Sequence, residues 1–239
     1  MSASNTFDGD RTREGHVDDL GVRSFVPAES DARDEGLKEH ILSEERIWEG
    51  KIFDVDRLQV SLADGRPAIR DVVRHPGAVA IVALTNEGQI CLVRQYRTAL
   101  DRVTVEIPAG KLDPGEDPLH CARRELEEET GCTAEKIAFL TSIATSAGFA
   151  DEIIHIFMAT GLSRGDAAPD ADEFLNVDLV DLSEVVDAVL DGKLEDAKTI
   201  VGVLICDSIA HRLGTVVEVE AEHEAVSDDY ELVVDEEEA

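Results

Sequence analysis

The sequence predicts a mixed α/β fold, and two observations support this prediction. Short strand-like stretches recur along the chain, including the wholly apolar Ala78–Leu84. Helix signals interrupt them, most clearly between Asp117 and Gly131. Strands interleaved with a few helices are typical of layered α/β domains, so we expect a mixed sheet covered by helices.

The first strands precede the predicted core. Alternating patterns predict strands at Arg46–Ile52, Phe53–Leu62 and Pro67–Arg74. Asp64 and Gly65 form a typical hairpin turn between the last two. We therefore expect a small antiparallel β segment ahead of the main domain.

The core begins with Ala78–Leu84, which we expect to be a central strand covered on both faces because it has no polar residue. The turn signal Asn86-Glu87-Gly88 joins it to a strand at Gln89–Val93, which predicts a second hairpin. Val103–Ile107 is the next expected strand. It leads directly to the segment Pro108-Ala109-Gly110.

Three further strands and two helices complete the expected fold. The strands are Ile137–Ile143, Ile153–Ala159 and Asn176–Asp181. Ser183 is a suitable cap for a helix that ends at Gly192, and Asp196 for a helix that ends at Gly214. Together with composition, these elements divide the chain into a polar, disordered lead-in (1–36), the N-terminal β segment (37–74), the main domain (75–217) and a mobile acidic tail (218–239).

Composition excludes several classes of partner. The net charge of −31 disfavours nucleic acid and anionic membranes. No apolar run is long enough to span a bilayer, and the first residues lack the apolar core of a secretion signal. The four cysteines are scattered without CxxC spacing, which indicates buried thiols in a reducing cytoplasm.

The helix between Asp117 and Gly131 places three glutamates close together. Asp117 is a suitable N-cap, Pro118 suits the first turn, and Gly131 suits a left-handed C-terminal residue. Glutamates at i, i+3 and i+4 repel one another, and a divalent cation would reverse the sign of that interaction. Taken alone, the three side chains could equally form a solvated acidic face. They are Glu125, Glu128 and Glu129.

The residues around these glutamates favour a divalent cation site over a solvated acidic face. The stretch GKLDPGEDPLHCARRELEEETGC fits the pattern Gly-x5-Glu-x7-Arg-Glu-U-x-Glu-Glu-x-Gly-U, in which U is a bulky aliphatic residue. It resembles the Nudix box, so the chain resembles the Nudix hydrolase family. The final U is Cys132, a small departure. The matching positions are Gly110, Glu116, Arg124, Glu125, Leu126, Glu128, Glu129 and Gly131.

The resemblance implies a fold and a metal site. It implies an α/β/α sandwich with the box helix against the sheet. It also implies Mg²⁺, with Mn²⁺ as an alternative, held by Glu125, Glu129 and the main-chain carbonyl of Ala109, with Glu128 assisting. Arg124 is expected to pair with Glu116 and to offset the crowded negative charge.

Sequences outside the box resemble the branch of ADP-ribose pyrophosphatases and nucleoside diphosphate sugar hydrolases. The stretches Ile69–Leu84, Val93–Arg97 and Glu106–Glu116 and the strand-rich segment 37–74 are similar to that branch. The resemblance implies hydrolysis of ADP-ribose or another nucleoside diphosphate sugar to a nucleoside monophosphate and a sugar phosphate. It also implies a homodimer in which segment 37–74 is exchanged and contributes to the nucleotide site.

Candidate substrate-binding residues follow from matched positions. An anionic pyrophosphate calls for arginine, whose planar fork fits phosphate oxygens. Arg94 and Trp48 are weaker candidates. The alternatives are a surface ion pair for the arginines, a solvated edge-strand acid for Glu106, and a core or interface position for Trp48. The turn at 145–149 has Ala147 where the branch often has proline, which weakens ADP-ribose relative to other sugars. The candidates are Arg70, Arg97, Glu106, Ser146, Gly148 and Glu152.

A general base could come from the acidic loop 165–173, where Glu173 best matches the branch and Asp172 is the alternative. A solvated acidic loop without a specific role is an equally open interpretation. Two other functions remain open. The chain could be a housecleaning hydrolase of oxidised nucleoside triphosphates, or a non-catalytic Nudix-like protein that binds ADP-ribose. The strand-rich segment argues against the first, and the intact charged positions of the box argue against the second.

Overall fold

The computed structural model describes residues 32–165 and 174–222. Residues 1–31, 166–173 and 223–239 lie outside this range, and with them most of the predicted lead-in and tail and the candidate bases Asp172 and Glu173. Contacts divide the chain into one compact unit of Met1–Ser43 with Gln59–Ile69 and another of Glu44–Leu58 with Arg70–Ala239. The elements are η1 (Ala32–Leu37), β1 (His40–Glu49), β2 (Asp54–Ser61), β3 (Pro67–Arg74), β4 (Ala78–Ala83), β5 (Gln89–Arg97), β6 (Arg102–Glu106), β7 (Ala109–Lys111), α1 (Pro118–Thr130), β8 (Cys132–Ala144), β9 (Ile153–Arg164), β10 (Leu175–Asp181), α2 (Leu182–Leu190) and α3 (Ala197–Glu222).

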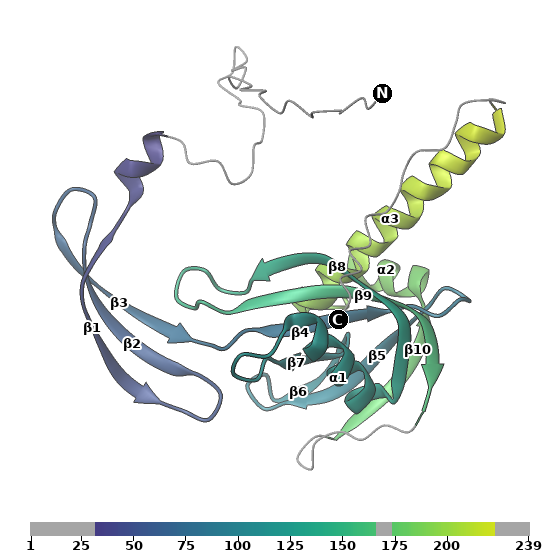
Figure 1. The fold of residues 1–239 in the computed structure, drawn as a ribbon, viewed down its shortest axis with the longest axis horizontal. Helices are drawn as coiled ribbons and strands as arrows, with labels where there is room; N and C mark the ends of the chain where they lie inside the picture. Colours follow the sequence, from purple (N-terminus) through teal and green to yellow (C-terminus); the bar gives the residue numbers. More distant parts are fainter. Residues whose placement is uncertain (1–31, 166–173, 223–239) are drawn as a thin grey trace, which may run out of the picture. The chain divides into compact units, whose positions relative to one another are not determined.

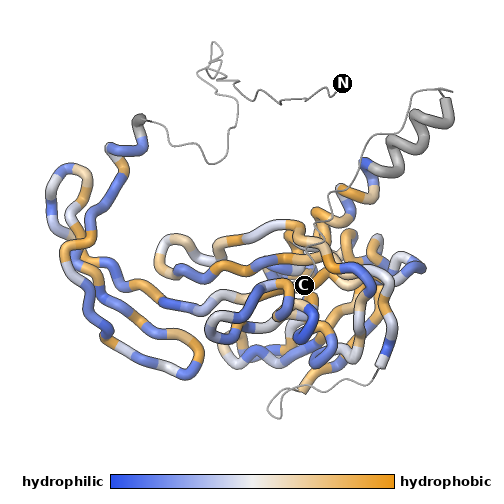
Figure 2. The backbone as a smooth tube through the Cα atoms, in the orientation of Figure 1, coloured by the Kyte–Doolittle hydropathy of each residue, from blue (hydrophilic) through white to orange (hydrophobic). Residues whose placement is uncertain are grey.

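The first three strands form their own sheet in the order β1-β2-β3. β3 has the predicted bounds, and hydrophobic and hydrophilic residues alternate along β2 in Figure 2. Gly65 occupies the predicted turn at φ 83°. The predicted bounds of the first strand were wrong: it starts at His40 and stops before Gly50, where a Cβ atom would lie 2.0 Å from the Trp48 ring.

Two further sheets form the main domain. β10-β5-β6 is antiparallel, whereas β7-β4-β9-β8 is mixed, because β4 runs parallel to β9 and antiparallel to β7. The second predicted hairpin, between the strands now labelled β4 and β5, was wrong, because these two strands do not pair along their length. The turn forms, with Gly88 at φ 81°, but β4 and β5 then enter different sheets and share one isolated bridge, Leu84 with Ile90. The apolar β4 has strand neighbours on both sides in its own sheet, so β5 is free to leave it.

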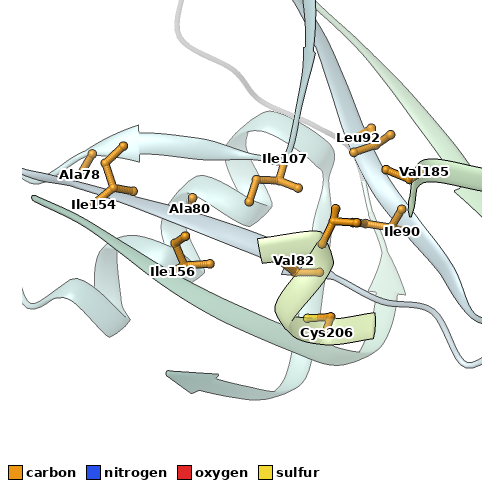
Figure 3. Packing of buried hydrophobic residues seen from close by; sticks show 11 residues of the cluster. Ala78, Ala80, Val82, Ile90, Leu92, Ile107, Ile154, Ile156, Val185 and Cys206 are labelled. Atoms are coloured by element: carbon orange, nitrogen blue, oxygen red, sulfur yellow. The ribbon is translucent and has the colours of Figure 1, made fainter. Parts of the chain in front are cut away.

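Helices cover both faces of the mixed sheet, as predicted (Figure 1). Alternate residues of β4 enter different layers: Val79 and Ile81 pack with α1, and Ala80 and Val82 with α3. Figure 3 shows the layer that contains Ala80 and Val82, in which Val82 lies beside Cys206 of α3. The prediction of an α/β/α arrangement with a central strand buried on both faces is confirmed.

The last two helices correct the predicted ends. α2 begins at Leu182, so Ser183 lies within it and is not its cap, although Gly192 adopts the expected left-handed conformation at φ 69°. α3 begins directly after Asp196, as predicted, but it continues through Gly214 to Glu222. A single glycine inside a helix costs only about 1 kcal/mol, and the preceding apolar turns offset this cost.

The four cysteines are buried and free, as the sequence predicted. Burial raises the pKa of the Cys91 thiol to about 12. In the part of the chain that is described, no helix combines the length and the apolar character that a bilayer crossing requires.

Candidate active site

Helix α1 forms because its two ends are well capped. The carboxylate of Asp117 accepts hydrogen bonds from the main-chain N–H groups of Leu119 and His120, at 3.0 and 3.1 Å. Gly131 ends the helix at φ 69°. Ala122 and Leu126 are buried against the sheet, which turns Glu125 and Glu129 toward β7.

Arg124 links the acidic residues of this helix to the preceding loop. Its Nε and Nη2 donate to Glu116 at 3.0 and 2.9 Å, and its Nη1 donates to Glu125 at 2.6 Å and to Glu128 at 2.9 Å. The predicted Glu116–Arg124 pair is therefore confirmed. The guanidinium lowers the pKa of the Glu116 carboxyl well below its usual range. One cation thus holds three carboxylates that would otherwise repel one another.

Glu125 and Glu129 meet the main chain at the start of β7. A carboxylate oxygen of Glu129 accepts a hydrogen bond from the N–H of Ala109 at 2.9 Å. The Glu125 carboxyl lies so close to Gly110 that a Cβ atom there would be 1.8 Å from its Cδ. Gly110 is therefore required for this approach. The two carboxylates, one helical turn apart, converge on a single dipeptide.

This arrangement fits a hard divalent cation. Carboxylate and carbonyl oxygens are the ligands that Mg²⁺ prefers. Glu125 and Glu129 are both buried, and the hydrogen bonds from Arg124 to Glu125 and from Ala109 to Glu129 hold their carboxylates in place. Within residues 32–165 and 174–222, no three acidic, histidine or cysteine side chains converge into a metal site by themselves. A main-chain carbonyl and substrate oxygens would have to complete the coordination.

A second group of charged residues surrounds Glu106, which was the edge-strand candidate. Glu106 is only 3 % exposed, so the alternative of a solvated acid was wrong. Arg97 donates to both of its carboxylate oxygens, through Nε at 2.8 Å and Nη2 at 2.6 Å. Thr104 and Lys198 donate to the same carboxylate. Burial would raise the pKa of Glu106, but these donors outweigh it and lower the value to about 2.

A cavity of about 520 Å³ opens beside this group. Its walls come from the β5–β6 region and from the link between α2 and α3. The hydrogen bonds to Glu106 are the main reason why the pKa of Arg97 is raised, and the negative charge of Glu129 on the box helix adds a smaller contribution in the same direction. Ligand sites commonly have such a volume and a few converging polar groups. The lining includes Arg97, Thr104, Glu106, Asp196 and Lys198.

The remaining predicted residues lie elsewhere. Ser146, Gly148 and Glu152 belong to the β8–β9 loop, which is held to β3 by hydrogen bonds of Val73 with Phe149 and Asp151. Glu152 accepts from Thr145 at 2.8 Å. These contacts order the loop, but they join it to β3 and not to α1.

Three other candidates, in contrast, lie on strands. Arg70 lies partly exposed on β3. Arg94 pairs with Asp178 at 2.6 Å, which matches the surface ion-pair alternative. Trp48 is 50 % exposed and packs on Phe53, with ring centroids 5.1 Å apart. Glu173 and Asp172 lie outside the described residues.

Sequence reasoning missed the residues behind Glu106. Asp196 was recognised only as a helix cap, and neither Lys198 nor Thr199 was singled out. The available signal was weak: a lysine directly after a capping aspartate, at the start of an apolar helix. Only the hydrogen bonds that link Lys198 to Glu106 and Thr199 to Ile107 reveal that these residues adjoin the site.

Fold and site together define a hydrolase with an acidic box helix on an α/β/α sandwich. Residues 74–201 match the family model of the NUDIX domain. The chain belongs to the Nudix family and is a Nudix hydrolase that acts on pyrophosphate bonds. Hydrolases of this family generally use divalent metal ions.

Known relatives cover most of the chain. The ADP-ribose pyrophosphatase of Bacillus subtilis (strain 168) is 47 % identical over 165 residues, which is 68 % of this chain and 89 % of the relative. The methanol dehydrogenase activator of Bacillus methanolicus is 46 % identical over 169 residues, covering 70 % and 91 %. A crystal structure of an ADP compounds hydrolase matches with a TM-score of 0.66 at 22 % identity, over 74 % of this chain and 96 % of that one, and so supports the fold.

Proposed function

We propose that this protein hydrolyses the pyrophosphate bond of ADP-ribose or a related nucleoside diphosphate sugar, giving AMP or another nucleoside monophosphate and a sugar phosphate. The observation that supports it most is the cavity lined by Arg97 and Glu106, because the chain runs from Glu106 in three residues to Ala109, whose N–H donates to Glu129 of the box helix. The cavity can hold a polar group next to the anhydride. The similarity to an ADP-ribose pyrophosphatase over most of both chains agrees with this choice.

The residues divide the work between binding and chemistry. Glu125 and Glu129, with the carbonyl of Ala109 and assistance from Glu128, would hold Mg²⁺ or Mn²⁺. A bound ion supplies Lewis acidity and lowers the pKa of bound water. Arg124 orients the carboxylates of Glu125 and Glu128 through the hydrogen bonds that its Nη1 donates to them.

Other residues are proposed to bind the substrate and to transfer the proton. Arg97 presents its positive charge to phosphate oxygens, and Arg70, Ser146, Gly148 and Glu152 are further candidate contacts. The general base is proposed to be Glu173, with Asp172 as the alternative. Glu173→Gln should lower turnover, with the KM for substrate little changed.

We also propose a homodimer built through the N-terminal sheet. Every residue of β1 is exposed, and among them are the large apolar side chains Ile41, Leu42, Ile47 and Trp48. Such a surface is typical of an interaction site, and most homodimers pair identical patches about a twofold axis. Because Ile47 is exposed, Ile47→Asp should dissociate the dimer without unfolding the protomer, as sedimentation would show. A monomeric wild-type protein at working concentration would refute the dimer.

The four buried thiols and the absence of a disulfide among them agree with the proposed reducing cytoplasm. The decisive experiment is turnover with Mg²⁺ across ADP-ribose, other nucleoside diphosphate sugars, dinucleoside polyphosphates and 8-oxo-dGTP. Preference for ADP-ribose or another sugar nucleotide supports the proposal. Preference for 8-oxo-dGTP would favour the housecleaning function, and binding of ADP-ribose without turnover would favour a non-catalytic role.

A further inference from the structure

Lys198 is the one lysine that is buried in the described part of the chain, at 8 % exposure. It lies in the first turn of α3, and its ammonium group donates to Glu106 and, at 2.9 Å, to Asp196. Removing a lysine from water is costly unless acidic partners compensate. The positive charge of Lys198 is therefore compensated by Glu106 and Asp196 and held in one position.

The surroundings of Lys198 join α3 to the end of β6. Asp196 caps α3 by accepting from the N–H of Thr199 at 3.0 Å, and it also accepts from the Thr199 hydroxyl at 2.5 Å. That hydroxyl in turn accepts a hydrogen bond from the N–H of Ile107 at 2.9 Å. Both the side chain of Glu106 and the main chain after it are thus held by one turn of α3.

The charges of this group balance only when Lys198 is present. Arg97 and Lys198 contribute two positive charges, and Glu106 and Asp196 contribute two negative ones. Without Lys198 the remaining three residues of this group, Arg97, Glu106 and Asp196, would carry a net charge of −1. Glu106 would then be neutralised by Arg97 alone, and less of the arginine's positive charge would act on an anionic ligand.

The geometry of Arg97 leaves part of its guanidinium available to an anionic ligand while Glu106 holds the rest. Its Nε and Nη2 are occupied by Glu106, and its side chain is 40 % exposed beside the cavity. Its Nη1 has no hydrogen-bond partner among residues 32–165 and 174–222. A guanidinium held on one edge can offer its other edge to a phosphate oxygen.

We propose that Lys198, held by Asp196, is a positioning residue that neutralises and orients Glu106 so that Arg97 faces the substrate's diphosphate. The inference rests on the proposed function. It assigns Lys198 no contact with the substrate, since its ammonium group donates to the carboxylates of Glu106 and Asp196. Its effect should therefore appear in substrate affinity and should depend on Glu106.

The test compares Lys198→Met with the exposed-lysine control Lys136→Met, which changes the net charge equally on β8. Lys198→Met should raise KM for the best sugar nucleotide about tenfold, the size expected for a lost charged hydrogen bond, with kcat nearly unchanged. Lys198→Arg, which keeps the charge, should recover most of the affinity. An equal KM change in both Met variants would show a long-range charge effect and overturn the proposal.

Coupling to Glu106 separates positioning from a purely structural role. If Lys198 acts through Glu106, adding Lys198→Met to Glu106→Gln should change KM little further. This double variant also removes both buried charges together, so it should fold even if Lys198→Met does not. Additive effects on KM, or a lower melting temperature with unchanged KM, would contradict positioning.

Binding without turnover separates this inference from the proposed function. The Kd for ADP-ribose measured by calorimetry in EDTA should rise about tenfold in Lys198→Met. If the wild type binds but hydrolyses no sugar nucleotide, the proposed function fails while the positioning role can still be confirmed. If wild type and variant bind equally, or neither binds, the positioning role is wrong.

Discussion

Gly110→Ala offers a direct test of the predicted metal site, because it adds one methyl group at the point where Glu125 meets β7. The new Cβ atom would lie 1.8 Å from Cδ of Glu125, and 2.0 and 2.2 Å from its two carboxylate oxygens. The main chain at residue 110 is not in the left-handed region, so alanine causes no backbone strain there. The substitution therefore acts on Glu125 and not on the strand.

The size of the effect follows from these distances. An ordinary contact of a Cβ atom is 3.4 Å or longer, so the carboxyl must retreat by about 1.6 Å from a contact of 1.8 Å. A flexible glutamate can make this movement, so we expect the melting temperature to change little. A displacement of about 1 Å in an active site can reduce the rate about a hundredfold. We expect kcat/KM for ADP-ribose to fall by at least about a hundredfold.

The assay is steady-state hydrolysis at saturating Mg²⁺, with thermal unfolding of the same samples. Two glycines serve as matched controls. Gly36→Ala has nothing within 4 Å of its new Cβ and should change neither property. Gly202→Ala places a Cβ 2.7 Å from Val82 in the packed core and should lower the melting temperature. Near-normal turnover of a folded Gly110→Ala protein would refute a role for Glu125 at this position.

Three further predictions concern charge. Glu129→Gln should keep the fold and reduce turnover by at least about a hundredfold, and a titration of turnover against Mg²⁺ should show weaker metal binding; unchanged metal dependence would contradict the assignment. Glu106 has a native pKa of about 2, against an ordinary value of 4.5, so its contribution to the free energy of unfolding is complete above pH 4.5 and is lost as the pH falls toward 2; Glu106→Gln should reduce this slope in acid denaturation curves. Because the net charge is −31, raising the salt concentration from about 20 to 150 mM should increase kcat/KM or leave it unchanged, and a steep decrease would show that the local arginines control substrate capture.

The sequence by itself determined the features that depend on neighbouring residues. The box helix begins after Asp117 and ends at Gly131, as predicted, because its caps act through hydrogen bonds within one or two turns. The Glu116–Arg124 pair was also predictable, since the loop and helix are joined by a short connection. The apolar composition of β4 alone required cover on both faces.

Only the tertiary structure decided how distant segments combine. Local turn chemistry predicted a hairpin after β4, but packing sent β5 into another sheet. The length of α3 was set by its context and not by Gly214. Glu106 looked like a possible surface acid, yet it is buried because Lys198, 92 positions later, supplies a compensating charge. The periodicity of a sequence reports which face of an element is apolar, whereas the pairing of buried charges depends on which elements meet in space.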